Sequence, residues 1–328
     1  MSPEERGKLV ELIRRGSRPL EPRPPGEDER RLLNGLRGAA GEDPEPRRFR
    51  ALLFDIYGTL FLSGSGDMGV LENGLCGEGS GGEILAPFAA PEDLPRLRGM
   101  FIAAVRDRHD ELRDVGERPE VRVEEIWAEL LGLSGEEARE FALRFELAVN
   151  PVYPMPGLER ILLRLRKAGV PLGIVSNAQF FTPLLFPAFL GKDLGDLGFD
   201  PELTVFSFRE GEAKPSPRLF EKAARALGKA RTLGKARVSE ERTSAGRGPD
   251  EDSLKQGGLE PGDVLFVGND MLNDVWAART AGFAAALYAG DGRSLRLRGE
   301  DPRCRDLRPD LVVESLDDVV AVMDIEER

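Results

Sequence analysis

Residues 51–61 read Ala-Leu-Leu-Phe-Asp-Ile-Tyr-Gly-Thr-Leu-Phe, an apolar run that leads to a carboxylate and a glycine turn. Four consecutive apolar residues, with charged residues before them and Gly58 after them, predict a short strand that is buried on both faces. The carboxyl end of such a strand faces the crevice where open α/β sheets bind ligands. We therefore take Asp55 as the candidate nucleophile. The alternative is an aspartate that only opens a tight turn.

The chain after residue 157 alternates helices and strands, which is the pattern of a parallel sheet with crossover helices. Helices are predicted over residues 158–167, 180–190 and 217–227. Further strands are predicted over residues 170–175, 203–207, 263–267, 283–288 and 311–313. Together with residues 51–54 these segments predict a Rossmann-like α/β core built on a parallel sheet.

A helical pattern fills the stretch between the first strand and this alternating region. Apolar residues recur at helical spacing from residue 91 to residue 150, which predicts a small separate helical bundle. The proline-rich segment 150–157 cannot continue a helix and marks the return to the core. We predict a core of residues 50–62 and 155–328, with a helical domain of residues 63–154 inserted into it.

Two segments fall outside this pattern. Residues 1–49 form an N-terminal arm with a short amphipathic helix at residues 4–15, then a proline-rich run and a charged run with little periodicity. The arm either packs on the core or a partner, or is largely disordered. Residues 229–258 are rich in small and charged residues and predict a disordered insertion within the core, with a basic docking tail as the alternative.

The composition restricts the possible partners. The formal net charge is −12 and the pI is about 4.9, which disfavours nonspecific nucleic-acid binding. Cys76 and Cys304 are the two cysteines, a number that fits a reducing compartment, and no Cys/His set has zinc-site spacing. No apolar run has the length of a signal peptide or a membrane span, so we expect a cytoplasmic protein without a membrane partner. The oligomeric state is open.

Polar residues stand next to the ends of several predicted strands: Ser176, Asn177, Lys214, Asp270 and Asp274. Strand ends of a doubly wound sheet converge on one crevice. Several oxygens together with Mg²⁺ would hold a phosphoryl group there while Asp55 attacks it and forms an aspartyl phosphate, which water then hydrolyses. Thr59 and Ser176 would hydrogen-bond phosphate oxygens, and Lys214 would offset their charge. The predicted substrate is a small phosphorylated metabolite.

These residues follow the order of four motifs, and over residues 50–315 the chain resembles the haloacid dehalogenase-like hydrolase superfamily. Motif one runs from Asp55 to Leu60, motif two is Ser176, motif three is Lys214, and motif four holds Asp270 and Asp274. The resemblance implies a helical cap between motifs one and two. The predicted helical domain at residues 63–154 occupies that place.

The resemblance also implies ligands for Mg²⁺. The nucleophile Asp55, the backbone carbonyl of Tyr57 and the acids of motif four would bind the cation. The glycine turn at Gly58 and the amide of Asn177 would lie beside the substrate.

Position 57 departs from the family pattern. Family phosphatases usually carry a second aspartate there as general acid and base, so with Tyr57 no residue is assigned to proton transfer. A tyrosine at this position resembles the 2-haloacid dehalogenase branch, in which the aspartate attacks carbon and displaces halide without a metal. The paired acids Asp270 and Asp274 favour a cation instead, because carboxylates crowded beside Asp55 would otherwise repel one another.

A second departure is the run Gly268-Asn269-Asp270, where the family commonly has Gly-Asp. Either Asn269 or Asp270 then takes the first ligand position of motif four. We favour Asp270, because an anionic ligand binds Mg²⁺ more strongly than an amide does. The alternative is that both residues cap a helix.

The predicted cap offers a few candidates for substrate recognition. His109, Arg106, Arg108 and Arg113 share one predicted helix and either reach an anionic substrate or form a solvated face. The segment 290–294 contains an arginine that would lie at the rim of the site or in solvent. We expect a Mg²⁺-dependent phosphatase. The alternatives are a metal-free 2-haloacid dehalogenase and a catalytically impaired ligand-binding or regulatory protein.

Overall fold

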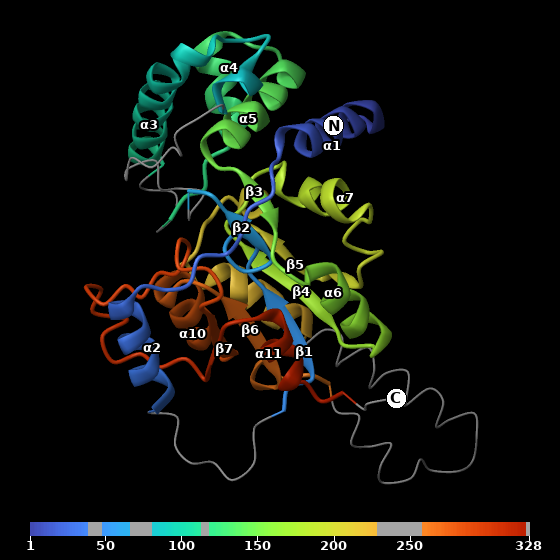
Figure 1. Ribbon diagram of the computed structural model, residues 1–328, viewed down its shortest axis with the longest axis vertical. Helices are drawn as coiled ribbons and strands as arrows, with labels where there is room; N and C mark the ends of the chain where they lie inside the picture. Colours follow the sequence, from blue (N-terminus) through green and yellow to red (C-terminus); the bar gives the residue numbers. More distant parts are fainter. Residues whose placement is uncertain (39–47, 66–80, 113–117, 228–257, 326–328) are drawn as a thin grey trace, which may run out of the picture.

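The computed structural model describes residues 1–38, 48–65, 81–112, 118–227 and 258–325. At its centre lies a parallel sheet with the strand order β5-β4-β1-β6-β7-β8 (Figure 1). The strands are β1 (Ala51–Phe54), β4 (Leu172–Ser176), β5 (Phe199–Phe206), β6 (Val264–Gly268), β7 (Ala284–Tyr288) and β8 (Leu311–Val313). The predicted Rossmann-like α/β core is confirmed.

Strand β1 lies in the middle of the sheet and is buried on both faces, as its continuous apolar run predicts. Leu52 and Phe54 belong to one apolar cluster, and Leu53 belongs to the cluster on the opposite face. The chain builds from β1 towards β5 and then crosses back to β6, which pairs with the other edge of β1. The carboxyl end of β1 is therefore the point where the strand order reverses.

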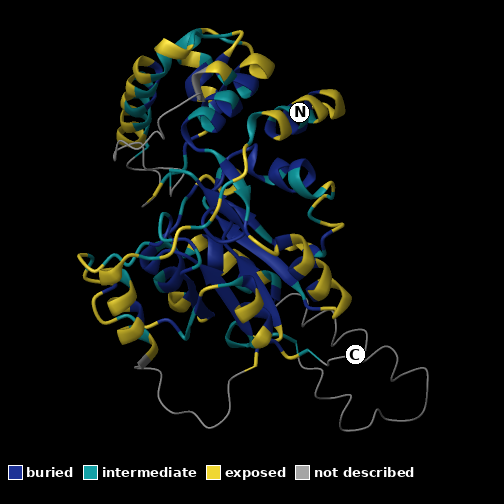
Figure 2. Cartoon of the chain, in the orientation of Figure 1, coloured by how far each residue is buried: buried dark blue, intermediate teal, exposed yellow. Residues whose placement is uncertain are grey.

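Helices cover both faces of the sheet, and Figure 2 shows the strands buried beneath them. One apolar cluster joins the sheet to α6 (Leu158–Lys167), α7 (Leu185–Leu190) and α11 (Leu316–Ala321). The other joins it to helical residues 218–227 and to α10 (Ala277–Thr280). Short helical turns complete the core: η4 (Thr182–Leu184), α8 (Ser207–Glu210), η6 (Pro261–Asp263) and η7 (Met271–Trp276).

Two predicted elements differ from the observed ones. The range 180–190 holds the turn η4 and the short helix α7 instead of one continuous helix, because Pro183 has no N–H to donate to a preceding turn. Strand β5 begins at Phe199, earlier than predicted, and its first residues are mostly exposed.

The inserted helical domain contains η2 (Gly81–Leu85), η3 (Pro91–Asp93), α3 (Leu94–Glu111), α4 (Val123–Leu131) and α5 (Gly135–Val149). Its core is aromatic. Trp127 of α4 stacks on Phe101 of α3 with ring centroids 5.1 Å apart and contacts Phe141 and Phe145 of α5 edge-on or tilted, each at 4.7 Å. We call this domain the cap.

Both connections of the cap to the core pass through one two-stranded ribbon. Strand β2 (Phe61–Ser63) pairs antiparallel with β3 (Val152–Pro154), so the chain enters and leaves the cap side by side (Figure 1). The predicted boundaries, after residue 62 and after residue 154, fall in this ribbon.

The N-terminal arm contacts both the cap and the core. Helix α1 (Pro3–Gly16) lies between α5 of the cap and α7 of the core (Figure 1). The buried carboxylate of Glu5 accepts a 2.5 Å hydrogen bond from Arg139 Nε of α5. On the other side, the Arg14 guanidinium donates to the carbonyl oxygens of Pro187 and Ala188 at 2.8 and 2.9 Å.

The arm then runs along the core to a second helix. The carbonyl of Arg23 accepts from the Gly292 N–H at 2.7 Å, and the Arg23 N–H donates to Asp291 Oδ1 at 2.8 Å. Helix α2 (Glu27–Gly38) follows and packs near β8. The sequence predicted no helix there, because half of the residues are charged and the segment shows little periodicity. Among the described side chains of α2, Leu33 alone is buried.

The predicted insertion at residues 229–258 lies, apart from residue 258, outside the described residues. Among the helices of the described ranges, none combines the length and the apolar character needed to cross a membrane.

Candidate active site

The glycine turn after β1 fixes the position of Asp55. Its backbone N–H donates to the Val267 carbonyl of β6 at 2.9 Å, so the residue still follows the sheet. Gly58 has a φ of +77°, and a Cβ there would lie 2.5 Å from Ser294 Cβ and 2.7 Å from Asn269 Nδ2. Only glycine fits this turn without displacing its neighbours.

Lys214 connects two carboxylates at the end of the sheet. Its Nζ lies 2.6 Å from Asp55 Oδ1 and 2.5 Å from Asp274 Oδ1, and all three side chains are buried. Burial alone would lower the pKa of Lys214, but the charges of Asp274 and Asp55 outweigh it and raise the pKa above its ordinary value. The lysine therefore stays charged.

The residues after β4 hold Lys214 in place. The Lys214 N–H donates to Asn177 Oδ1 at 2.7 Å, and Asn177 Nδ2 donates back to the Lys214 carbonyl at 3.3 Å. The hydroxyl of Ser176 donates to the Asn177 carbonyl at 3.1 Å, and the hydroxyl of Thr59 donates to Asn269 Oδ1 at 3.3 Å. The structure thus places these sequence-predicted residues close to one another.

Asp270 and Asp274 follow the same strand but have different partners. Asp270 caps η7, with its Oδ1 accepting from the Leu272 and Asn273 N–H groups at 2.8 and 3.1 Å. Its Oδ2 accepts from Arg298 at 2.7 Å and from Asn273 Nδ2 at 3.1 Å. Asp274 pairs with Lys214 and accepts from the Asp270 N–H at 3.0 Å.

The oxygen atoms at this end of the sheet are of the kind that binds Mg²⁺. In the described residues, no group of three or more His, Cys, Asp or Glu side chains is arranged to hold a metal ion. The carboxylates of Asp55 and Asp274, the amide oxygen of Asn269 and the Tyr57 carbonyl are all oxygens, and Mg²⁺ commonly uses one or two carboxylates with waters and substrate phosphate. Asp270 stays a predicted ligand, although its several N–H donors count against it.

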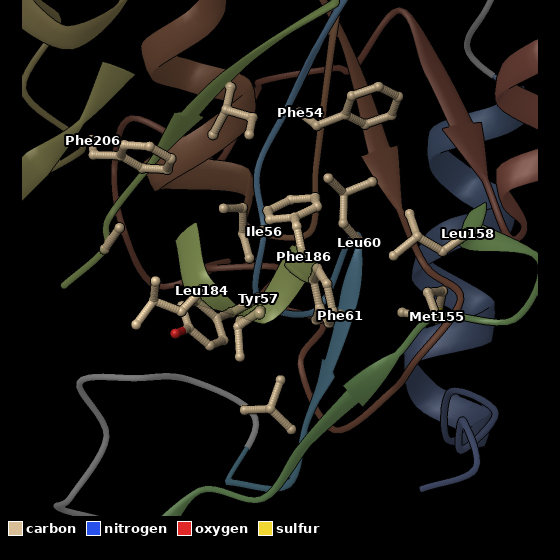
Figure 3. Packing of buried hydrophobic residues seen from close by; sticks show 14 of the residues in the cluster. Phe54, Ile56, Tyr57, Leu60, Phe61, Met155, Leu158, Leu184, Phe186 and Phe206 are labelled. Atoms are coloured by element: carbon tan, nitrogen blue, oxygen red, sulfur yellow. The ribbon is translucent and has the colours of Figure 1, made fainter. Parts of the chain in front are cut away.

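Tyr57 is buried at the end of the sheet. Its ring lies in the same apolar cluster as Leu184 and Phe186 (Figure 3), and its hydroxyl lies 3.1 Å from Thr182 Oγ1. Burial raises the pKa of Tyr57 above its ordinary value. The phenol therefore keeps its proton at neutral pH.

A cleft of about 500 Å³ separates this end of the sheet from the cap. We define its core-side wall as Asp55, Tyr57, Asn177, Lys214, Asn269 and Asp274. We define its cap-side wall as Phe101, Val105, Arg106, His109, Glu120 and Phe145. The cleft thus joins charged groups at the sheet to a partly apolar cap surface.

The predicted recognition residues of the cap separate into two groups. His109 and Arg106 line the cleft. Arg108 lies on another side of α3, where it pairs with Glu129 at 2.7 Å, and Arg113 lies outside the described residues. The rim arginine of segment 290–294, Arg293, donates to the Glu21 carbonyl of the arm and to Asp291 and is not part of the cleft lining.

Sequence reasoning missed several residues of the cleft, among them Glu120, Gln179 and Arg298. Glu120 comes from a segment between two cap helices, Gln179 lies two positions after Asn177, and Arg298 approaches from the loop after β7. Arg298 has a φ of 51°, which is uncommon for a side chain of this size. Gln179 could have been found by its place after β4, whereas Glu120 and Arg298 carry no local signal.

Comparisons with solved structures give low sequence identity and broad coverage. A HAD phosphatase from Thermococcus onnurineus matches at 19% identity and a TM-score of 0.43, covering 85% of this chain and 100% of that one. An L-2-haloacid dehalogenase from Xanthobacter autotrophicus matches at 18% and 0.43, covering 84% and 98%. A predicted phosphoglycolate phosphatase from Haemophilus somnus matches at 18% and 0.42, covering 84% and 97%.

The family comparison is more specific. No curated protein sequence matches the chain. The model of the haloacid dehalogenase-like hydrolases matches residues 49–282, which is well over half of the chain and includes the strand that carries Asp55. The protein belongs to the haloacid dehalogenase-like hydrolase family.

Proposed function

We propose that the protein hydrolyses small phosphorylated metabolites, with Asp55 as nucleophile and Mg²⁺ as cofactor. The charge of the buried cluster carries this proposal. Asp55 and Asp274 share the ammonium of Lys214, while Asp270 pairs with Arg298. Three carboxylates thus face two cations.

The surplus negative charge affects Asp274 most. Burial, followed by the charges of Asp55 and Asp270, raises the pKa of Asp274 above its ordinary value despite the nearby Lys214. A phosphate dianion beside Asp55 would add further negative charge to this cluster. A divalent cation would offset it, which is why a phosphorylated substrate and Mg²⁺ are proposed together.

The proposed reaction has two steps. A carboxylate oxygen of Asp55 forms a bond to phosphorus while the ester P–O bond breaks and the leaving oxygen takes a proton. Water then attacks the aspartyl phosphate, which releases inorganic phosphate and restores Asp55. Lys214 orients the carboxylate of Asp55. Thr59 and Ser176 stay the proposed hydroxyl donors to the phosphoryl oxygens, although both side chains are fully buried and neither lines the cleft.

The proposed cation would be held by Asp55, Asp274, the backbone carbonyl of Tyr57 and either Asp270 or the amide of Asn269. When bound, Mg²⁺ would neutralise charge on the phosphoryl oxygens.

The test is a panel of phosphomonoesters assayed for phosphate release with Mg²⁺ and with EDTA, using the wild type and Asp55→Asn. We expect Mg²⁺-dependent release by the wild type alone. Full activity of Asp55→Asn, or activity that EDTA leaves unchanged, would contradict the proposal. Binding of Mg²⁺ and phosphate without hydrolysis of any ester would instead favour a regulatory role.

A second candidate is metal-free dehalogenation of 2-haloacids. The neutral amide of Asn269 favours it, since a metal-using site gains affinity from a carboxylate at that position. Asp55 would then attack carbon, the carbon–halogen bond would break, and water would hydrolyse the resulting ester. Release of halide from 2-haloacids in the presence of EDTA, without phosphate release from any ester, would establish this alternative.

A further inference from the structure

Cleavage of an alkyl phosphate needs a proton donor, because an alkoxide is a poor leaving group. The aspartates on the core side of the cleft are already engaged. Asp55 is the proposed nucleophile, Asp274 is paired with Lys214, and Asp270 accepts hydrogen bonds from Arg298 and two N–H groups of η7. A proton donor must therefore come from another part of the cleft.

Tyr57 does not fill this role. Its hydroxyl shares a hydrogen bond with Thr182 Oγ1, and this oxygen accepts from the Gln179 N–H at 3.0 Å. Because burial raises the pKa of Tyr57, the phenol would neither release its proton nor take one up readily.

Glu120 lies on a cap segment that is docked against the core beside the site. The Arg118 carbonyl accepts from the Ala213 N–H at 2.8 Å, and the Glu120 N–H donates to the Gly211 carbonyl at 3.0 Å. The core segment in this pairing leads directly into Lys214. The docking fixes the backbone of Glu120 relative to the sheet, and its side chain lines the same cleft as Asp55.

The carboxyl group of Glu120 is oriented by core and cap together. Its Oε1 accepts from Gln179 Nε2 at 3.1 Å and from the Val121 N–H at 3.0 Å. Gln179 Nε2 also donates to the Val121 carbonyl at 2.9 Å. Burial raises the pKa of Glu120 to about 7, although hydrogen bonds from Ser207, Val121 and Gln179 lower it. Both protonation states are therefore populated near neutral pH, as acid and base catalysis requires.

Two other titratable groups of the cleft fit the role less well. Glu146 Oε1 accepts from Asn150 Nδ2 at 2.9 Å, next to the ribbon that connects the cap. Burial and the charge of Arg118 lower the pKa of His109, so at neutral pH its imidazole is uncharged and has no labile acid proton to give.

We propose that Glu120 is the proton-transfer residue of this site, an inference that rests on the proposed phosphatase function. In the first step the Glu120 carboxyl gives its proton to the leaving oxygen as the ester P–O bond breaks and the Asp55–phosphorus bond forms. In the second step the Glu120 carboxylate takes a proton from water as the water oxygen attacks phosphorus and the aspartyl P–O bond breaks. The cycle restores the Glu120 acid and the Asp55 carboxylate.

The test compares Glu120→Gln with the wild type on two substrates that differ in their leaving groups. Glycerol phosphate needs protonation of its leaving oxygen, whereas p-nitrophenyl phosphate does not. With glycerol phosphate we expect kcat to fall by about a hundredfold or more. With p-nitrophenyl phosphate we expect a burst of nitrophenolate stoichiometric with enzyme, then slow turnover, because the aspartyl phosphate accumulates when no base activates water.

Two further variants separate catalysis from structural damage. Glu124→Gln changes a buried carboxylate of the neighbouring cap helix that does not line the cleft, and we expect wild-type rates. Glu146→Gln tests the rival acid. If Glu146→Gln shows the burst of nitrophenolate and Glu120→Gln does not, the inference is overturned. It is also overturned if Glu120→Gln loses the burst and the steady-state rate with p-nitrophenyl phosphate to the same extent.

The outcomes also separate this inference from the proposed function. If the wild type hydrolyses phosphomonoesters and Glu120→Gln behaves like it on both substrates, the inference fails and the proposed function stands. If the wild type hydrolyses none of them, both fail.

Discussion

The two walls of the cleft are built in different ways. In the core-side wall, Asp55, Lys214 and Asp274 follow strands or strand-linked turns and bond to one another, so the parallel sheet determines their spacing. In the cap-side wall, Phe101 and His109 project from one helix, and Glu120 is held by hydrogen bonds to core loops. The sheet thus supplies a fixed set of charges, and the cap supplies a surface whose position depends on docking.

The largest expected effect is on the core-side wall. Lys214→Met leaves Asp55 and Asp274 buried without their shared cation, so we expect the free energy of unfolding at neutral pH to fall by about 3–5 kcal/mol. Hydrolysis should fall by about a hundredfold or more, since Lys214 also orients the nucleophile. Urea unfolding and steady-state kinetics measure both effects.

A second substitution and a control variant test whether buried charges without a partner cause the loss of stability. Adding Asp274→Asn to Lys214→Met removes one buried charge and should restore part of the stability but none of the activity. Lys222→Met removes a partly exposed pair with Glu210 and should change the free energy of unfolding by less than about 0.5 kcal/mol. Wild-type stability of Lys214→Met would show that the cluster does not depend on this lysine.

A smaller effect is expected on the cap-side wall. His109→Ala removes a cleft-lining side chain on the cap side, away from the proposed reacting atoms at the sheet, so KM should rise by about tenfold while kcat changes little. Arg108→Ala on the same helix is the matched control, because Arg108 pairs with Glu129 away from the cleft. A loss confined to kcat would place His109 in the chemical step instead.

The smallest effect concerns the N-terminal arm, which contacts both the cap and the core. Glu5→Gln weakens the contact between α1 and Arg139 of the cap, and we expect the free energy of unfolding at neutral pH to fall by about 1 kcal/mol. The hydrogen bond from Arg139 holds the pKa of Glu5 below its usual range. The difference between wild type and Glu5→Gln should therefore be complete above the unfolded-state pKa and disappear as the pH falls through the lowered folded-state pKa.

Thermal unfolding of both proteins across this pH range measures the effect. Glu11→Gln is the control, because Glu11 pairs within α1 with Arg15 and is more exposed. A difference that persists at low pH would mean that the charge of Glu5 is not its source.

The sequence predicted the parts of the molecule that have a local signature. Residues 51–54 are a continuous apolar run, and the runs before Ser176 and Asp270 have the same character, so the sheet and its carboxyl edge could be inferred. The roles of Asp270 and Asp274 could not be separated in this way, because Arg298, which pairs with Asp270, comes from a distant loop.

The cap-side wall shows a second kind of feature that the sequence could not predict. Glu120 has no periodic or motif context, and only the pairing of its segment with residues 211–213 brings it to the cleft. Helix α2 was not predicted for a related reason. Half of its residues are charged, and its described face towards the core contributes Leu33 and the partly buried Leu36, which is a narrow apolar stripe. A contact between segments that are distant in sequence produces no local periodicity or motif, so it could not be predicted from the sequence.

The ribbon of β2 and β3 has a consequence for how such a protein can diversify. Because Phe61 pairs with Pro154 and Ser63 with Val152, the two ends of the inserted domain are neighbours in space. Such an insertion can be exchanged for one of another size, or shortened to a turn, without changing the order of the strands beneath it. The range of substrates can then change when the inserted domain is replaced, while the residues at the end of the sheet stay the same. In this protein the contacts of α1 with the cap and with the core form a second connection. A replacement domain would therefore have to preserve the α1 contact as well as the ribbon.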